Sequence, residues 1–157
     1  MRHIMKNAVI VSGGNINTDF ALDFLKKNTD ENTLLIAADR GLEFFEKTGL
    51  VPHIAVGDFD SLSESGRKFL ETLSNTEIIR LRPEKDDSDT QSAACLAMDR
   101  GMKRIMILGA TGNRVDHLMA NFGLLVLGME RGGEIILADP WNYMKLIESG
   151  TVLKRSE

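Results

Sequence analysis

Short hydrophobic runs alternate along the chain with longer amphipathic segments. Six runs rich in Val, Ile, Leu and Ala lie at residues 8–11, 34–37, 54–56, 78–81, 105–108 and 135–138. Nearly continuous apolar runs of this length are typical of strands that other elements cover on both faces. Between them, helical spacing predicts helices at 20–27, 42–47, 64–73, 91–100 and 117–131. This alternation predicts right-handed βαβ units, and so an α/β fold with three layers (α/β/α) and a mostly parallel, Rossmann-like sheet.

The last part of the chain departs from this alternation. After Asp139-Pro140, residues 142–147 and 151–153 are compatible with a β-hairpin around a turn at 148–150. An isolated hairpin is only marginally stable in water. Two alternatives follow: the hairpin adds to the main sheet, or it begins a further domain.

Composition narrows the class of protein. A length of 157 residues and a hydrophobic content of 43% suit one domain with a substantial core. The net charge of −4 and the lack of a basic run argue against a nucleic-acid partner. The apolar start at 8–11 is too short for a signal peptide or a membrane span. A single cysteine, Cys95, excludes an internal disulfide and fits a reducing compartment. We therefore expect a soluble cytoplasmic protein.

The first acidic cluster is Gly57-Asp58-Phe59-Asp60-Ser61, directly after a predicted strand. In an extended segment, Asp58 and Asp60 point to the same side and Phe59 points the other way into packing. An Asx-turn that leads into a helix capped by Ser61 or Ser63 explains the same residues equally well.

The second cluster is Lys85-Asp86-Asp87-Ser88-Asp89-Thr90. At the start of a helix, Asp86 and Asp89 share a face because they are three residues apart. Ser88 or Asp89 also suits an ordinary N-cap. Capping needs only one side chain, however, and repulsion among three acids disfavours the cluster unless Lys85 or a cation offsets it.

Two further loops follow predicted strands. The turn at 109–117 contains glycines that suit a phosphate cradle of backbone N–H groups, with Arg114 as a charge partner. Asp116 and His117 have a plainer explanation, as residues that begin a helix. Asp39-Arg40-Gly41 places one more acid and one more arginine after a strand, although a surface turn is about as good an interpretation.

The four loops together predict a binding rim. The carboxyl ends of parallel strands lie along one edge of such a sheet, where ligands bind. Several carboxylates on one edge repel one another unless a cation lies between them, and Mg²⁺ prefers oxygen ligands shared with substrate phosphates. The pattern therefore predicts a metal-dependent enzyme that acts on a nucleotide phosphate.

At these residues the chain resembles the thiamine pyrophosphokinase family. The motifs Gly-Asp-x-Asp-Ser, Lys-Asp-x-Ser/Thr-Asp and Gly-x-x-Gly-x-Arg-x-Asp-His all occur here, in the family's order. The resemblance implies transfer of a pyrophosphoryl group from ATP to the hydroxyl of thiamine, giving AMP and thiamine diphosphate. Alternatives are a pyrophosphokinase acting on a hydroxymethyl-pterin and a module that binds Mg-nucleotide without turnover.

The resemblance also implies roles for individual residues. Mg²⁺ ligands are expected at Asp58, Asp60 and Asp89, and these residues with Asp86 form the expected catalytic set. ATP contacts are expected at Asp39, Arg40, Lys85, Ser88, Thr90, Gly112, Arg114, Asp116 and His117.

Family members form homodimers and continue into a C-terminal β-sandwich that helps to bind thiamine. From the resemblance we expect a catalytic α/β domain over residues 1–140. Residues 141–157 are expected to start the thiamine-binding β domain, the rest of which is absent from this chain.

Overall fold

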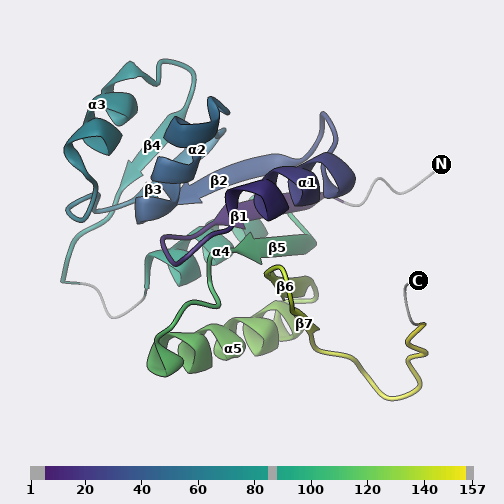
Figure 1. Cartoon of the computed structure of the whole chain (residues 1–157). Helices are drawn as coiled ribbons and strands as arrows, with labels where there is room; N and C mark the ends of the chain where they lie inside the picture. The colour runs from purple at the N-terminus through teal and green to yellow at the C-terminus, as the bar shows by residue number, and fades with distance from the viewer. Residues whose placement is uncertain (1–5, 85–87, 155–157) are drawn as a thin grey trace.

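The structure, a computed structural model, describes residues 6–84 and 88–154. Within these residues one sheet has the strand order β4-β3-β2-β1-β5-β6-β7 (Figure 1). The strands are β1 (Asn7–Val11), β2 (Leu34–Ala38), β3 (Ile54–Gly57), β4 (Glu77–Arg80), β5 (Arg104–Leu108), β6 (Glu134–Ala138) and β7 (Tyr143–Lys145). All neighbouring pairs are parallel except β6 with β7, which is antiparallel. The predicted α/β fold with a mostly parallel sheet is confirmed.

The helices connect the parallel strands. They are α1 (Thr18–Asn28), α2 (Leu42–Thr48), α3 (Glu64–Thr72), α4 (Asp89–Asp99) and α5 (Val115–Glu130), with a short 3-10 helix η1 (Asp39–Gly41) before α2. Three of them begin at a capping side chain, because the Asn17, Ser63 and Ser88 oxygens accept backbone N–H groups that the helix leaves unpaired. None of the helices among the described residues has the length and apolar character needed to cross a membrane.

The core lies on both faces of the sheet. On one face, alternate strand residues such as Val9 and Met106 pack against α1, α2 and the segment around α3. On the other face, Ile10, Ile107 and their neighbours pack against α4 and α5. Strand side chains alternate between the faces, so the continuous apolar runs serve both layers at once. This is the three-layer arrangement seen in Figure 1.

The edges of the sheet differ from the sequence prediction. Strand β4 is an edge strand whose residues are mostly exposed, so the expectation that both of its faces are covered is wrong for this run. At the opposite edge, β7 adds to the main sheet through β6, which was one of the two alternatives for the tail. Residues 151–153 form no strand, and the expected hairpin is therefore absent.

The order of the strands creates one special position. The chain builds β1 to β4 in one direction, and then returns to place β5, β6 and β7 on the other side of β1. Connections leave the carboxyl ends of β1 and β5 in opposite directions, so a crevice opens between them.

Candidate active site

A cavity of about 590 Å³ opens at this crevice. Its size lies in the range of small-molecule sites. Five segments line it: the turns after β1, β2 and β5, and the starts of α4 and α5. The lining residues are Ser12, Gly13, Gly14, Asn15, Ala38, Asp39, Arg40, Ser88, Asp89, Thr90, Gly109, Ala110, Gly112, Asn113, Arg114, His117, Ala120 and Asn121.

Two glycine turns meet at the base of the cavity. The Gly14 N–H donates to the Gly109 carbonyl at 2.9 Å. A Cβ at Gly14 would lie 2.3 Å from that oxygen, and a Cβ at Gly109 would lie 2.5 Å from the Ser12 carbonyl oxygen. Gly109 also has a φ of 73°, which favours glycine. No larger residue allows these two backbones to approach so closely.

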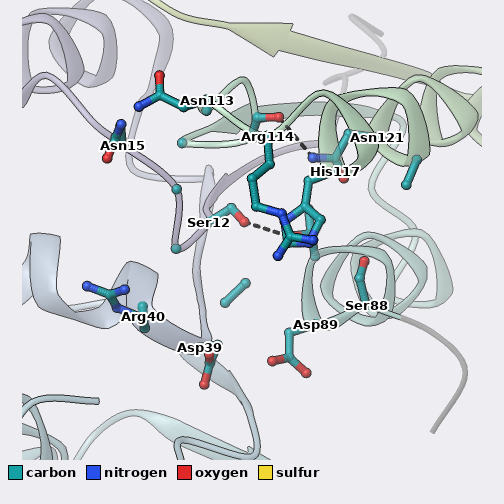
Figure 2. A pocket seen from close by; sticks show the side chains of 18 residues that line it. Ser12, Asn15, Asp39, Arg40, Ser88, Asp89, Asn113, Arg114, His117 and Asn121 are labelled. Carbon is teal, nitrogen blue, oxygen red and sulfur yellow. Dashed lines mark hydrogen bonds between the residues drawn. The ribbon is translucent and has the colours of Figure 1, made fainter. Parts of the chain in front are cut away.

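Three carboxylates gather at the rim of the cavity. Asp39, Asp58 and Asp89 each offer an oxygen, and these oxygens lie within 4.8 Å of one another. They come from the ends of β2 and β3 and from the first residue of α4. Figure 2 shows Asp39 and Asp89 together at one end of the cavity, while Asn15 and Asn113 lie at the other. The cavity therefore has an acidic end and an amide-lined end.

Two loops with unusual backbone angles hold this acidic group. Asp39 and Phe59 both have positive φ, 48° and 63°. The Phe59 N–H donates to Asp39 Oδ1 at 3.1 Å, and the Ser61 hydroxyl donates to Asp39 Oδ2 at 2.6 Å. Phe59 is buried, and the Arg80 guanidinium lies 5.5 Å from the centre of its ring. Strained residues of this kind persist only where their surroundings hold them.

The electrostatics of the group suit a cation. Burial raises the pKa of Asp39, and the neighbouring carboxylates of Asp89 and Asp58 raise it further, although the Ser61 hydrogen bond opposes them. Three half-buried carboxylates with oxygen donors so close together match a hard divalent ion such as Mg²⁺.

The cluster after β3 has a different geometry from the expected one. Asp60 is not a member of the three-carboxylate group among the described residues. Its N–H donates to Asp58 Oδ1 at 2.9 Å, so the segment is also an Asx-turn. The left-handed Phe59 breaks the extended geometry that would align Asp58 with Asp60. Asp39, expected only as an ATP contact, lies in the group instead.

The second acidic cluster is described from Ser88 onward; Lys85 and Asp86 lie outside the described residues. Ser88 caps α4 by accepting the Gln91 N–H at 3.1 Å. The buried Thr90 hydroxyl lies 2.5 Å from the Ser12 hydroxyl, which joins the start of α4 to the end of β1. Capping and cavity lining are thus combined in one turn of helix.

The turn after β5 brings Gly112, Arg114 and His117 to the cavity lining. Asp116 is not among the lining residues; both of its carboxylate oxygens accept from Arg114, at 3.1 and 2.6 Å. The hydrogen bonds from Arg114 lower the pKa of Asp116. Asp116 does not cap the helix, since α5 begins at Val115 with Arg114 in the capping position.

Arg40 also lines the cavity, and its guanidinium lies 3.7 Å from a Glu43 carboxylate oxygen. Both arginines therefore keep a carboxylate neighbour while they face the cavity. Arg114 and Arg40 supply positive charge to the cavity lining.

Several residues of the cavity were not predicted from the sequence. Ser12, Asn15 and Asn121 line the cavity, and Asn121 Nδ2 donates to the Ala110 carbonyl at 2.9 Å. Asp139 was noted only as the start of the tail. It does not line the cavity, but it follows a strand, as Asp39 and Asp58 do.

The region that contains most of these site residues also resembles known proteins. A model of the thiamin pyrophosphokinase catalytic domain matches residues 25–137. The chain belongs to the thiamin pyrophosphokinase family. Thiamine pyrophosphokinase of Bacillus subtilis (strain 168) is 34% identical over 146 residues, which are 93% of this chain and 66% of that protein. The resemblance seen in the three motifs is thereby confirmed.

Solved structures agree. The crystal structure of thiamine pyrophosphokinase from Bacillus subtilis matches with a TM-score of 0.73 at 33% identity, over 86% of this chain and 61% of that one. The thiamin pyrophosphokinase from Geobacillus thermodenitrificans matches with a TM-score of 0.69 at 30% identity, over 85% and 59%. The chain thus spans between 59% and 66% of the length of these thiamin pyrophosphokinases.

Proposed function

We propose that this chain carries the ATP- and Mg²⁺-binding site of a thiamine pyrophosphokinase, which transfers pyrophosphate from ATP to the thiamine hydroxyl and releases AMP. The observation that carries the proposal is the group of Asp39, Asp58 and Asp89 at the rim of a nucleotide-sized cavity. Membership of the thiamin pyrophosphokinase family supports the choice of reaction.

The described residues divide the work by position. Asp39, Asp58 and Asp89 would hold Mg²⁺, which when bound neutralises phosphate charge. Arg40 and Arg114 line the cavity and supply donors for phosphate oxygens. Rigid placement of these groups matters because phosphoryl transfer depends mainly on positioning and electrostatics. Roles for Asp60, Asp86 and Lys85 stay predictions of the family resemblance.

Product analysis tests the reaction type. Purified protein is incubated with Mg-ATP and thiamine, and nucleotides are separated over time. Pyrophosphoryl transfer breaks the bond between the α- and β-phosphates, so we expect AMP and thiamine diphosphate in equal amounts. ADP as the first product would exclude the proposal. Faster AMP release with a hydroxymethyl-pterin than with thiamine would identify the pterin as the acceptor.

A second candidate function is nucleotide binding without transfer. Calorimetry with Mg-ATP and, separately, with thiamine distinguishes the two. Binding of Mg-ATP without thiamine binding and without AMP release would select this candidate.

Assembly and location complete the proposal. Along α5, Val115, Met119, Phe122, Val126 and Met129 are all exposed. They repeat at intervals of four and three residues, which suits a contact between helices and supports a homodimer. Light scattering with size-exclusion chromatography measures the mass in solution.

The free thiol of Cys95 supports a cytoplasmic location, which fractionation of cells tests.

A further inference from the structure

Asp139, at the carboxyl end of β6, accepts several hydrogen bonds on both of its carboxylate oxygens. Its Oδ1 accepts the backbone N–H of Trp141 and of Asn142, each at 2.8 Å. The Asn142 side-chain amide donates to both oxygens at 3.0 Å. Oδ2 accepts the Thr111 hydroxyl at 2.6 Å. This last bond crosses from β6 to the turn after β5.

That turn is the one that lines the cavity with Gly112, Asn113 and Arg114. The structure tethers it on three sides. Gly109 accepts the Gly14 N–H, and Ala110 accepts the Asn121 side-chain amide. The bond from Thr111 to Asp139 is the third tether and the nearest in sequence to the lining residues. The position of Thr111 therefore sets where the next three residues enter the cavity.

The tether is separate from the acidic group. Asp139 is not a member of the Asp39, Asp58 and Asp89 cluster in the described part of the chain. In the sheet, β6 lies beyond β5, on the opposite side of β1 from β2 and β3. A change at Thr111 or Asp139 should therefore affect the turn of residues 112–114, which lines the cavity, and leave the acidic end of the cavity unaffected.

We propose that Asp139 is a positioning residue for nucleotide binding, acting through the Thr111 hydroxyl on the turn from Gly112 to Arg114. The inference rests on the proposed function, because it takes the cavity to be a nucleotide site. Asp139 does not touch the nucleotide itself. Its function is to keep the backbone N–H groups and the arginine of this turn in the geometry that phosphate or ribose oxygens require.

The matched pair Thr111→Val and Thr111→Ser tests the tether. Valine keeps the shape and removes the hydroxyl, whereas serine keeps the hydroxyl and removes the methyl group. Mg-ATP affinity is measured by calorimetry, and Mn²⁺ affinity without nucleotide by electron paramagnetic resonance. We expect Thr111→Val to weaken Mg-ATP binding about tenfold, because the turn loses one tether and must then be ordered when the nucleotide binds. Thr111→Ser should bind within about twofold of the native chain, and Mn²⁺ affinity should not change in either variant.

The variant Asp139→Asn tests the same tether from its other end. Its amide cannot accept the Thr111 hydroxyl and all the N–H donors together, so nucleotide affinity should fall at least as far as in Thr111→Val. Native-like Mg-ATP affinity in Thr111→Val, equal losses in the valine and serine variants, or a parallel loss of Mn²⁺ affinity would each overturn the inference. If the native chain itself bound no nucleotide, the proposed function would fail, and this inference with it.

Discussion

Asp39 and Asp139 occupy equivalent places, each just after a parallel strand, yet their surroundings are opposite. Asp39 accepts two hydrogen bonds, is half-buried, and faces two other carboxylates. Asp139 accepts hydrogen bonds from Thr111, Trp141 and Asn142 and faces no acidic cluster among the described residues. Accordingly, the pKa of Asp39 is raised, mainly by burial. Partial burial also raises that of Asp139, but its hydrogen bonds outweigh the effect and lower the pKa.

The difference separates two uses of one residue type. A carboxylate with several N–H and O–H donors is already satisfied, and it fixes the backbone around it. A carboxylate crowded by like charges stays electrostatically unsatisfied until a cation arrives. At this rim, crowding by like charges therefore suits a binding position, whereas saturation with donors suits a structural one.

The largest effect is expected at the crowded end. Asp89→Asn should reduce turnover by at least about 100-fold and weaken Mg-ATP binding, because it removes one of three closely spaced oxygen ligands. Stability should change little. Turnover, calorimetry and thermal unfolding measure the three effects. Glu31→Gln removes the same charge in an exposed turn between α1 and β2 and serves as control. Unchanged Mg-ATP binding in Asp89→Asn would contradict the shared-cation site.

Asp139→Asn should lower stability by about 1–2 kcal/mol at neutral pH, because the amide cannot accept all the hydrogen bonds of the carboxylate, although most of their donors are exposed to water. The folded-state pKa of Asp139 lies below its ordinary value of 3.8. Its ionised form therefore contributes stability that is present above that value and is lost as the pH falls through the folded-state pKa. Denaturant unfolding at several pH values should show the gap between native chain and variant closing in acid. A gap that does not change with pH would contradict this account.

The smallest effect has the opposite sign. In metal-free protein, Asp39→Asn should raise stability by up to about 1 kcal/mol, because it removes a half-buried charge beside two others, and Asn tolerates a positive φ. Since the folded-state pKa of Asp39 is raised, the charge costs stability only as pH rises through it, and the advantage of the variant should vanish in acid. Thermal unfolding in a chelator measures this. A loss of stability at neutral pH would mean that the Asp39 charge stabilises the loops.

Much of the fold could be predicted from the sequence. The six predicted parallel strands appear within one or two residues of their expected bounds, because a buried strand must be apolar along its whole length. The prediction that both faces of β4 are covered was wrong, since an apolar run does not reveal whether other elements pack against the strand. The tail was half right. A strand at Tyr143–Lys145 pairs with β6, whereas residues 151–154 form no strand.

The sequence predicted that the acidic residues lie along one edge of the sheet, but not which of them lie close together. Spacing alone paired Asp58 with Asp60, whereas the structure groups Asp58 with Asp39, 19 positions earlier in the chain. This grouping depends on the left-handed backbone of Phe59 and Asp39, which the local sequence does not predict. Asp139 was missed because it stands outside the three motifs, although it lies within the predicted α/β domain of residues 1–140. Its partner Thr111 is 28 residues away.

The two edges of the sheet also constrain how copies of the chain can meet. Strand β4 carries Glu77, which pairs with Arg100 at 2.6 Å, and β7 carries Lys145, which pairs with Glu134 at 3.2 Å. Both strands are short, and a charged edge disfavours the docking of a foreign strand. The sheet should therefore not extend from one molecule to the next.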